Sequence, residues 1–422
     1  MLEQIKSLFP SVYDRYLLEK LHHYSHYHRI HNRRLKEIRK RGSARVLFIL
    51  SNLAIWRSED ICRLLMEDGR FDVRLVICPF ADLADSQKKN NTEELIAYCQ
   101  RLHWPYILKS ETDRNLIESL DPDIVFYPQM YTELYRNELD CEKNLDRLLV
   151  YVPYGICTVS GDWQYNSRFL NNTWKFFVPT PLHRDYARHH SFIKGKNMEV
   201  VGDSHGSAFM REPETDPWKK QDKPKKRIIW APHFSINEGG HLNRASFLWL
   251  HQLMVELSRE YRDDLQFVFK PHPWLLSELY KHPDWGEKKA DEYYEFWRSG
   301  ENTQLETGAF IDLFNTSDAL IHDCGSFTAE YHFTGKPVLF VSKDFPAVYQ
   351  GLDLFGTRCM DLHYHAQNAD DIRSFIRHTV LEGDDPMKED RDRFRKQYLI
   401  PPEGFSFGNN VYRSLTESLF PH

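Results

Sequence analysis

Short apolar runs alternate with stretches of helical periodicity from residue 45 onward. In the first half of the chain, the apolar runs predict strands at residues 45–51, 71–80, 106–108, 123–127, 148–154, 175–179 and 198–202. Helical stretches, such as 58–69 and 92–102, separate these runs. Nearly continuous apolar strands between helices are typical of a parallel sheet that is covered on both faces. The pattern therefore predicts a Rossmann-like α/β domain over residues 45–210.

The alternation stops at residues 211–227, REPETDPWKKQDKPKKR, which are polar, charged and rich in proline. Such a composition predicts a linker between domains. Strands are predicted again at residues 228–231, 265–270, 319–322 and 337–341, with helices at 246–261, near 312 and at 328–334. We therefore predict a second Rossmann-like domain over residues 228–400. Residues 401–422 are expected to form a helix that crosses back to the N-terminal domain.

Residues 1–44 form a separate segment, which we predict to be a basic amphipathic helix. Residues 1–45 carry eleven Lys and Arg against four Asp and Glu, together with five histidines. The predicted apolar face is formed by Leu17, Leu21, Tyr24, His28, His31, Leu35 and Ile38. Two interpretations stay open: the helix packs on the protein body with a solvated basic back, or it binds an anionic membrane surface. The basic residues of the second interpretation are Arg33, Arg34, Lys36, Arg39, Lys40 and Arg41.

Composition narrows the class of protein. A chain of 422 residues with 41% hydrophobic residues is long enough for about two domains. The formal charge of −6 argues against a nucleic-acid partner. The seven cysteines contain no CxxC pair, as expected of reduced core residues. No apolar run approaches the roughly 18 residues of a membrane span, so we expect a cytoplasmic protein, either free or at the inner face of the cell membrane.

Polar residues follow the predicted strands of the second domain, where ligands of parallel sheets bind. The fingerprints GxGxxG and GxxxxGK[ST] are absent. The strand at 265–270 runs into Lys270 and His272, and the prolines on both sides of His272 stiffen its backbone. The strand at 228–231 is followed by His233. An imidazole in this position suits a general base or a hydrogen-bond donor to phosphate, and the alternative is a histidine that only caps a turn.

The third polar element is residues 323–330, Asp-Cys-Gly-Ser-Phe-Thr-Ala-Glu, between a strand and a helix. A helix start offers unpaired N–H groups to a phosphate, and the hydroxyls of Ser326 and Thr328 add donors. Asp323 and Glu330 would repel phosphate, so we expect them to bind sugar hydroxyls or to orient neighbouring groups. The alternative is an ordinary N-cap. Together with His233 and His272, the element predicts a site for a phosphorylated, nucleotide-like ligand.

These residues resemble the CDP-glycerol glycerophosphotransferases, which build teichoic-acid and capsule polymers. The resemblance lies in LFNTSDALIHDCGSFTAEYHFTGKPVLFV (313–341), FVFKPHPW (267–274) and, more faintly, RIIWAPHFS (227–235), and it spans roughly residues 150–345. It implies a GT-B fold, two Rossmann-like domains with the active site in the cleft between them. The first domain is then the acceptor side and the second the nucleotide-donor side. It also implies that His272 lies near the diphosphate, and that Asp323, Ser326 and Phe327 hold the diphosphate. Independently of the resemblance, Gly325 is expected to let the backbone turn tightly at the phosphate.

The acceptor side departs from the family pattern. Tyr154 and Gly155 fall where the family shows a histidine-glycine pair, which is proposed to help deprotonate the acceptor hydroxyl. Tyrosine, with a pKa near 10, is a poor base at neutral pH. His205, in Gly202-Asp203-Ser204-His205-Gly206, is therefore a candidate base, although this segment lacks the family's proline-arginine pair.

The function expected from the resemblance is transfer of a phosphopolyol, glycerol phosphate first of all, from a CDP-activated donor to a hydroxyl of a surface glycan or a growing polymer, with release of CMP. No carboxylate cluster calls for a metal, so we expect no obligatory cofactor. One alternative is a GT-B glycosyltransferase that uses a nucleotide-sugar donor. A second is a catalytically silent GT-B domain that binds nucleotide.

Overall fold

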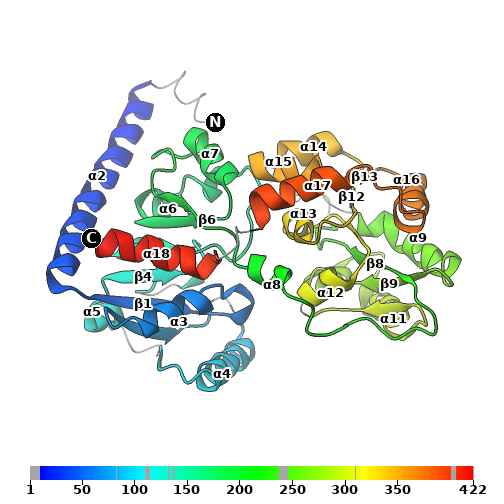
Figure 1. Ribbon diagram of the computed structural model, residues 1–422, viewed down its shortest axis with the longest axis horizontal. Helices are drawn as coiled ribbons and strands as arrows, with labels where there is room; N and C mark the ends of the chain where they lie inside the picture. The colour runs from blue at the N-terminus through cyan, green and yellow to red at the C-terminus, as the bar shows by residue number, and fades with distance from the viewer. Residues whose placement is uncertain are drawn as a thin grey trace. The chain divides into compact units, whose positions relative to one another are not determined.

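The computed structural model describes residues 10–81, 83–109, 115–131, 134–135, 138–236, 246–308, 310–400 and 405–421, with the backbone alone for residues 10–18 and 162. The chain divides into two compact units (Figure 1). Unit 1 comprises Met1–Gly155, Asp162–Ser204 and Glu403–His422, and unit 2 comprises Ile156–Gly161 and His205–Pro402.

Unit 1 is built on a seven-stranded parallel sheet in the order β3-β2-β1-β4-β5-β6-β7. Its strands are β1 (Ala44–Leu50), β2 (Phe71–Ile77), β3 (Tyr106–Leu108), β4 (Ile124–Tyr127), β5 (Leu148–Tyr151), β6 (Lys175–Val178) and β7 (Met198–Val200). Its helices are α2 (Pro10–Arg41), α3 (Glu59–Glu67), α4 (Asp85–Arg101), α5 (Leu116–Leu120), α6 (Arg168–Asn172), α7 (Pro181–His190) and α18 (Phe407–Leu419).

Unit 2 is built on a six-stranded parallel sheet in the order β10-β9-β8-β11-β12-β13. Its strands are β8 (Lys226–Ala231), β9 (Leu265–Phe269), β10 (Thr303–Leu305), β11 (Ala319–His322), β12 (Val338–Val341) and β13 (Tyr364–Ala366). Its helices are α8 (Gly206–Met210), α9 (Phe247–Glu260), α10 (Leu275–Lys281), α11 (Gly286–Ser299), α12 (Ile311–Thr316), α13 (Phe327–Glu330), α14 (Phe345–Gln350), α15 (Leu354–Met360), α16 (Ala369–Ser374) and α17 (Lys388–Phe394). Both sheets follow the doubly wound strand order, so the prediction of two Rossmann-like units is confirmed.

The segment that composition predicts to be a linker lies against unit 2. Trp218 is buried, and its indole N–H donates to the Thr316 hydroxyl at 3.0 Å. Thr215 donates to the Asp312 carboxylate at 3.1 Å, and the Lys219 amide donates to Gln304 Oε1 at 2.6 Å. One buried aromatic ring and these hydrogen bonds fasten an otherwise polar segment to α12 and β10.

The last helix, α18, belongs to unit 1 although the chain enters it from unit 2 (Figure 1). Ser406 caps its start by accepting from the Asn409 amide. Phe407, Val411, Leu415 and Leu419 recur every four residues and form one buried stripe in the core of unit 1. Because α18 packs against α3, the two ends of unit 1 in the sequence share one core.

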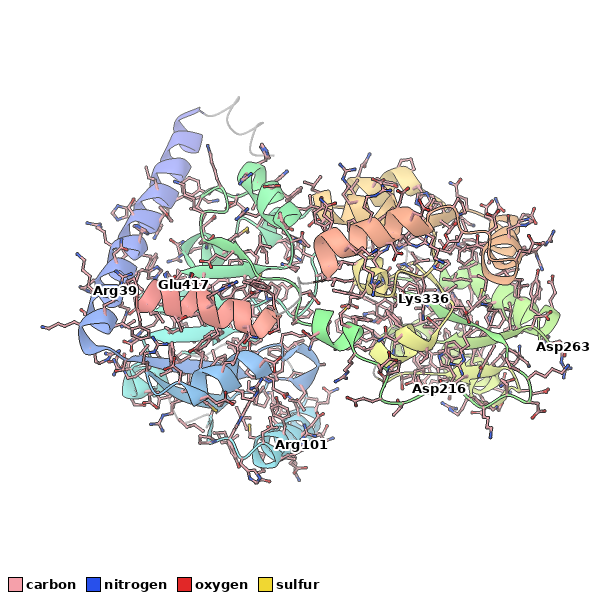
Figure 2. All side chains as sticks on the ribbon, in the orientation of Figure 1. Arg39, Arg101, Asp216, Asp263, Lys336 and Glu417 are labelled. Atoms are coloured by element: carbon pink, nitrogen blue, oxygen red, sulfur yellow. The ribbon has the colours of Figure 1, made fainter. Side chains whose placement is uncertain are left out.

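The N-terminal helix α2 is only partly attached along the predicted apolar face. Ile38 and His31 are buried, whereas Leu21 and His28 are exposed. The structure therefore replaces the expected continuous apolar face with contacts in the second half of the helix. Arg39 donates to Ser418 O at the end of α18 (Figure 2), where a cation also suits the helix dipole.

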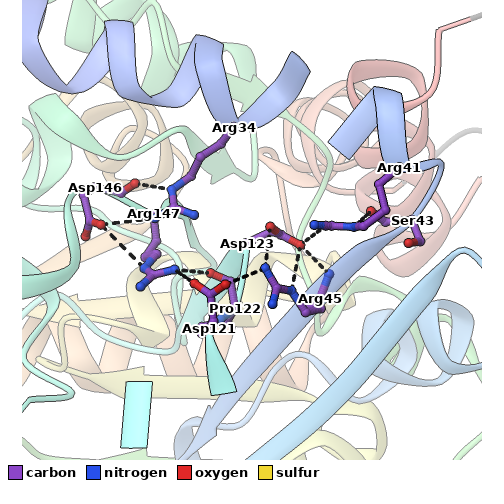
Figure 3. A network of polar contacts seen from close by, with 9 residues as sticks. All are labelled: Arg34, Arg41, Ser43, Arg45, Asp121, Pro122, Asp123, Asp146 and Arg147. Carbon is purple, nitrogen blue, oxygen red and sulfur yellow. Dashed lines mark hydrogen bonds and ion pairs between the residues drawn. The ribbon is translucent and has the colours of Figure 1, made fainter. Parts of the chain in front are cut away.

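A network of ion pairs joins the end of α2 to the start of the sheet (Figure 3). Arg34 donates to Asp146 O at 2.6 Å and pairs with the Asp146 carboxylate at 3.2 Å. The almost fully buried carboxylate of Asp123 pairs with Arg41 and accepts from the Arg45 amide at 2.8 Å. Arg34, Arg39 and Arg41 thus have partners elsewhere in unit 1, and Arg33 pairs with Glu37 within α2 at 3.9 Å, so four of the six basic residues assigned to a membrane surface have protein partners. Contact with a membrane remains a prediction.

Among the helices of the described part of the chain, none combines the length and the apolar character that membrane crossing requires.

We expect Asp123→Ala to lower the free energy of unfolding by about 2–3 kcal/mol, because it leaves the part-buried Arg45 amide and the Arg41 guanidinium without this acceptor, while the Arg45 guanidinium keeps its pair with Asp121. Urea denaturation followed by circular dichroism measures this change. The matched control is Asp72→Ala, which removes the exposed pair between Asp72 and Arg74 and should cost less than about 0.5 kcal/mol. Equal effects of the two substitutions would show that the network does not stabilise unit 1.

Candidate functional site

Three adjacent strands of unit 2 end at the candidate site. In the sheet order, β9, β8 and β11 are neighbours, and they are followed by His272, His233 and Asp323, respectively. The order of connections reverses between β8 and β11, and this switch point is where doubly wound sheets bind ligands. The strand topology therefore brings together three elements that lie far apart in the sequence.

Asp323 is completely buried and its carboxylate holds the loops in place. Oδ1 accepts from the His233 amide at 2.6 Å. Oδ2 accepts from the hydroxyl of Ser246 and from its amide, the latter at 3.3 Å. One carboxylate thus joins the end of β11 to the loop after β8 and to the start of α9. The geometry assigns Asp323 an orienting function, in line with one of the two roles suggested by the sequence.

His272 is held between its prolines on the loop after β9. Its amide donates to Pro232 O at 3.0 Å, and its Nδ1 accepts from the Trp274 amide at 3.2 Å. Burial lowers the pKa of His272 to about 4, so the ring is neutral at physiological pH. Since Nδ1 is an acceptor, the proton of the neutral ring is on Nε2. His272 therefore presents a hydrogen-bond donor and not a base.

His233 lies beside His272, with the ring centroids 5.2 Å apart. The Ser235 hydroxyl is 2.8 Å from Nδ1 of His233, and the Ser235 amide donates to the same nitrogen at 3.3 Å. The amide contact requires a lone pair on Nδ1, so His233 also carries its proton on Nε2. The two histidines that the sequence predicts on one edge of the sheet are neighbours in the structure.

Lys270 adds a buried cation one residue after β9. Its ammonium donates to Gly308 O at 2.7 Å, which uses one of its three N–H groups. Burial lowers the pKa of Lys270, while Glu306 and Cys324 act in the opposite direction. Residues 306–308 follow β10, so a fourth strand end contributes to the site.

Two aromatic residues at the site were missed by the sequence analysis. Phe234 packs on His272 with centroids 4.5 Å apart and meets Trp274 edge-on at 5.1 Å. Trp274 is 62% exposed, which is unusual for so large an apolar side chain. The signal was present in the sequence, since each ring follows a strand-end histidine within two residues. Together the two rings pack beside the imidazoles of His233 and His272.

The side chains of the polar stretch 323–330 differ in burial. Thr328 is buried and its hydroxyl donates to Cys324 O at 3.0 Å, and Glu330 is also buried. Ser326 is exposed, and Gly325 O accepts from the Thr158 hydroxyl at 3.3 Å. The helix that follows, α13, is only four residues long. Ser326 is therefore the hydroxyl of this stretch that is open to solvent, whereas Thr328 serves the turn itself.

A chain of buried imidazoles lies behind this turn and was also missed. His322 Nδ1 accepts from the Cys324 amide at 3.1 Å, and His322 Nε2 is 3.1 Å from His363 Nε2. His363 Nδ1 is 2.8 Å from Cys359 O, to which it donates, so His322 must donate to His363. Burial holds the pKa of His363 well below its usual range. This neutral chain fixes the direction of the Cys324 amide.

In the described residues, no group of three or more metal-ligating side chains is arranged to hold an ion.

The remaining predicted site residues lie in two other places. His205 precedes α8 in unit 2, and its ring contacts Phe310 at 6.0 Å. Phe310 in turn packs on Phe327 at 5.5 Å, which links His205 to the start of α13. Tyr154, 40% exposed, and Gly155 belong to unit 1. They lie in the loop after β5, which ends at Tyr151, three residues earlier than the sequence predicts.

Comparison with known proteins identifies the fold. No family model and no curated protein matches the chain. Among solved structures, a variant of the wall teichoic acid polymerase TagF is similar over 99% of both chains, with a TM-score of 0.55 and 12% identity. MnaA of S. aureus, in a co-structure with UDP, is similar over 89% of this chain and 97% of its own, with a TM-score of 0.55 and 16% identity. A putative UDP-N-acetylglucosamine 2-epimerase of Listeria monocytogenes is similar over 89% and 96%, with a TM-score of 0.54 and 14% identity. These similarities, with the two doubly wound sheets, confirm the GT-B fold.

We expect the imidazole of His272 to titrate with a pKa near 4 and to carry its proton on Nε2 at neutral pH. Histidine-selective ¹⁵N labelling and long-range ¹H–¹⁵N NMR measure both, with His272→Ala to assign the signal. Because the folded pKa lies below the unfolded value near 6.5, the unfolded chain binds this proton first. The contribution of His272 to stability is therefore complete above pH 6.5 and declines as the pH falls towards 4. A pKa near 6.5, or a proton on Nδ1, would contradict the assignment of His272 as a donor.

Proposed function

We propose that this protein is an enzyme of cell-envelope glycan synthesis that transfers a phosphopolyol, glycerol phosphate first of all, from a CDP-activated donor to a hydroxyl of a glycan or polymer, and releases CMP. The observation that carries the proposal is that His233 and His272 lie with their ring centroids 5.2 Å apart at two neighbouring strand ends, with the buried Lys270 two residues before His272 and the exposed Trp274 two residues after it. Cationic and neutral donors suit a diphosphate, and an aromatic ring suits a nucleobase.

In the proposed reaction, the acceptor oxygen attacks the phosphorus that carries the polyol. The bond from this phosphorus to the bridging oxygen breaks, and CMP leaves with the electron pair. Negative charge grows on the bridging and non-bridging oxygens, so donors fixed in advance lower the barrier. Lys270, His272 and the exposed hydroxyl of Ser326 would supply them, and the buried Asp323 would hold the loop that carries His233.

The proton of the acceptor hydroxyl needs a separate base. His272 does not suit this step, because its pKa is about 4 and its Nδ1 already accepts from the Trp274 amide. We propose His205 for this function, with Tyr154 as the alternative on unit 1. The donor side of the reaction is thus supported by more contacts than the acceptor side.

The comparisons support the proposal at a coarse level. TagF is named as a wall teichoic acid polymerase, and this chain is similar to its variant over nearly its whole length. Combined with the motifs at residues 267–274 and 313–341, this similarity favours phosphopolyol chemistry.

A second candidate function follows from the same comparisons. MnaA was solved with UDP, and the enzyme of Neisseria meningitidis with UDP-GlcNAc, at TM-scores of 0.55 and 0.51. A site with an aromatic surface and phosphate donors also suits a nucleotide sugar. The protein would then act on a UDP-linked sugar, as a glycosyltransferase or in another reaction of that donor.

We expect incubation with CDP-glycerol and a glycerol-phosphate-primed acceptor to release CMP and to extend the acceptor by one glycerol phosphate, detected by anion-exchange chromatography and mass spectrometry. Parallel incubation with UDP-GlcNAc should release no UDP and leave the sugar unchanged. His272→Ala is the negative control. Release of UDP, or epimerisation of the sugar, would favour the second candidate. Binding without turnover of either donor would favour a catalytically silent domain.

We expect Trp274→Ala to weaken CDP binding about tenfold, because loss of one stacked base costs roughly 1–3 kcal/mol. Isothermal titration calorimetry measures the affinity, with CMP, UDP and GDP as comparison ligands. Trp163→Ala is the matched control, since Trp163 is an exposed tryptophan of unit 1. If both substitutions left CDP affinity unchanged, Trp274 would have no part in binding the base.

A further inference from the structure

A short segment of the chain between β5 and β6 is bound to unit 2. It comprises Ile156–Gly161, and the chain belongs to unit 1 again from Asp162 onward. We call this segment the strap. Because β5 and β6 are neighbours in the sheet of unit 1, a connection between them has no need to leave that unit. The attachment of the strap to unit 2 therefore calls for a separate reason.

The strap is fastened by main-chain hydrogen bonds to the residues before α15. Thr158 O accepts from the Asp353 amide at 3.0 Å, and the Ser160 amide donates to Gly351 O at 3.0 Å. Between these two bonds, Leu352 forms an antiparallel bridge with the strap. Leu352 is buried in an apolar cluster that also holds residues of β12 and α15. The strap is thus attached to a well-packed part of unit 2.

The start of α15 leaves room for the strap because residue 356 is a glycine. A Cβ at Gly356 would overlap Thr158 O and would lie 3.0 Å from Thr158 Cβ. Asp353 joins the two elements, since its carboxylate accepts from the Gly356 amide at 2.7 Å while its own amide donates to Thr158 O. Thr158, 3% exposed, is therefore held both by hydrogen bonds and by close packing.

From this position the Thr158 side chain reaches the turn that begins the polar stretch 323–330. Gly325 O accepts from the Thr158 hydroxyl and from the Thr328 amide, each at 3.3 Å. Gly325 has no Cβ, so its own backbone restrains the turn little. Because a peptide unit is planar, a bond that holds the Gly325 carbonyl also holds the Cα of Ser326. Thr158 thus restrains the residue that carries the exposed hydroxyl of this stretch.

We propose that Thr158 is a positioning residue of the candidate site, and that the strap holds its hydroxyl against the Gly325 carbonyl so that Ser326 keeps a fixed place. The inference rests on the proposed function, in which the Ser326 hydroxyl is a donor to the reacting phosphate. Donors that are fixed in advance lower a barrier, because they need no reorganisation while the charge grows. Thr158 acts through the turn and does not itself touch the ligand.

Two substitutions of Thr158 separate its hydroxyl from its shape. Thr158→Val removes the hydroxyl, and we expect it to lower the kcat for release of CMP from CDP-glycerol about tenfold while KM changes less than about twofold. Thr158→Ser keeps the hydroxyl and should restore kcat to within about threefold of the wild type. Ser160→Ala is the matched control, because it removes from the same strap a hydroxyl that donates to Gln350 O at 3.2 Å and not to the turn. It should leave kcat unchanged.

Hydrogen exchange followed by mass spectrometry tests the positioning without any turnover. The amides of Thr328, Ala329 and Glu330 donate to Gly325 O or Ser326 O, so their exchange reports opening of the turn. In the peptide that covers them, we expect exchange about fivefold faster in Thr158→Val and unchanged in Thr158→Ser and Ser160→Ala.

Gly356→Ala displaces the strap while the Thr158 hydroxyl is kept, so it should speed exchange in the same peptide. Melting temperatures show whether each variant folds. If Gly356→Ala unfolds, the comparison of Thr158→Val with Thr158→Ser still decides the question.

Unchanged exchange and unchanged kcat in Thr158→Val would overturn the proposal. So would equal losses in Thr158→Val and Ser160→Ala, which would make the strap a general support of unit 2. A rise in KM at constant kcat, or a change in only one of the two measurements in a preparation that releases CMP, would overturn it as well. If the wild type releases no CMP, the proposed function is wrong, whereas the exchange rates still decide whether Thr158 positions the turn.

Discussion

The buried carboxylate of Asp323 is the interaction on which the candidate site depends. It holds the His233 amide and both donors of Ser246, so that the ends of β8 and β11 and the start of α9 keep fixed positions. A carboxylate completely removed from water is stable only when its oxygens are hydrogen-bonded, which makes the arrangement specific. The candidate site is thus built from main-chain positions at strand ends that one carboxylate holds together.

Burial also keeps His272 neutral. His272 is neutral because desolvation penalises the imidazolium, and amide donors to Nδ1 leave the protons of His233 and His272 on Nε2. His322 accepts from the Cys324 amide and donates to His363, and these two hydrogen bonds orient the amide. Under the proposed function, a phosphate would meet the neutral His272 ring and the buried ammonium of Lys270, an arrangement that offers hydrogen bonds and limits the accumulation of positive charge.

The sequence predicted the fold well and the site only in part. Alternating apolar runs and helices determine a parallel sheet, so two Rossmann-like units could be predicted, and the residues after β8, β9 and β11 could be named. The pattern does not say which side chains of residues 323–330 turn inward, because both faces of a turn tolerate polar residues. That the side chains of Thr328 and Glu330 are buried could therefore be learned only from the structure. The exposure of Trp274 and the partial attachment of α2 could not be predicted either, because periodicity alone does not report exposure.

The most direct measurement is a crystal structure of the protein with CDP. The proposed function predicts the diphosphate within hydrogen-bond distance of Lys270 Nζ and His272 Nε2, the exposed Ser326 hydroxyl close to it, and the cytosine stacked on Trp274. Density for CDP at the carboxyl edge of the unit 1 sheet, or a diphosphate that contacts neither Lys270 nor His272, would contradict the account.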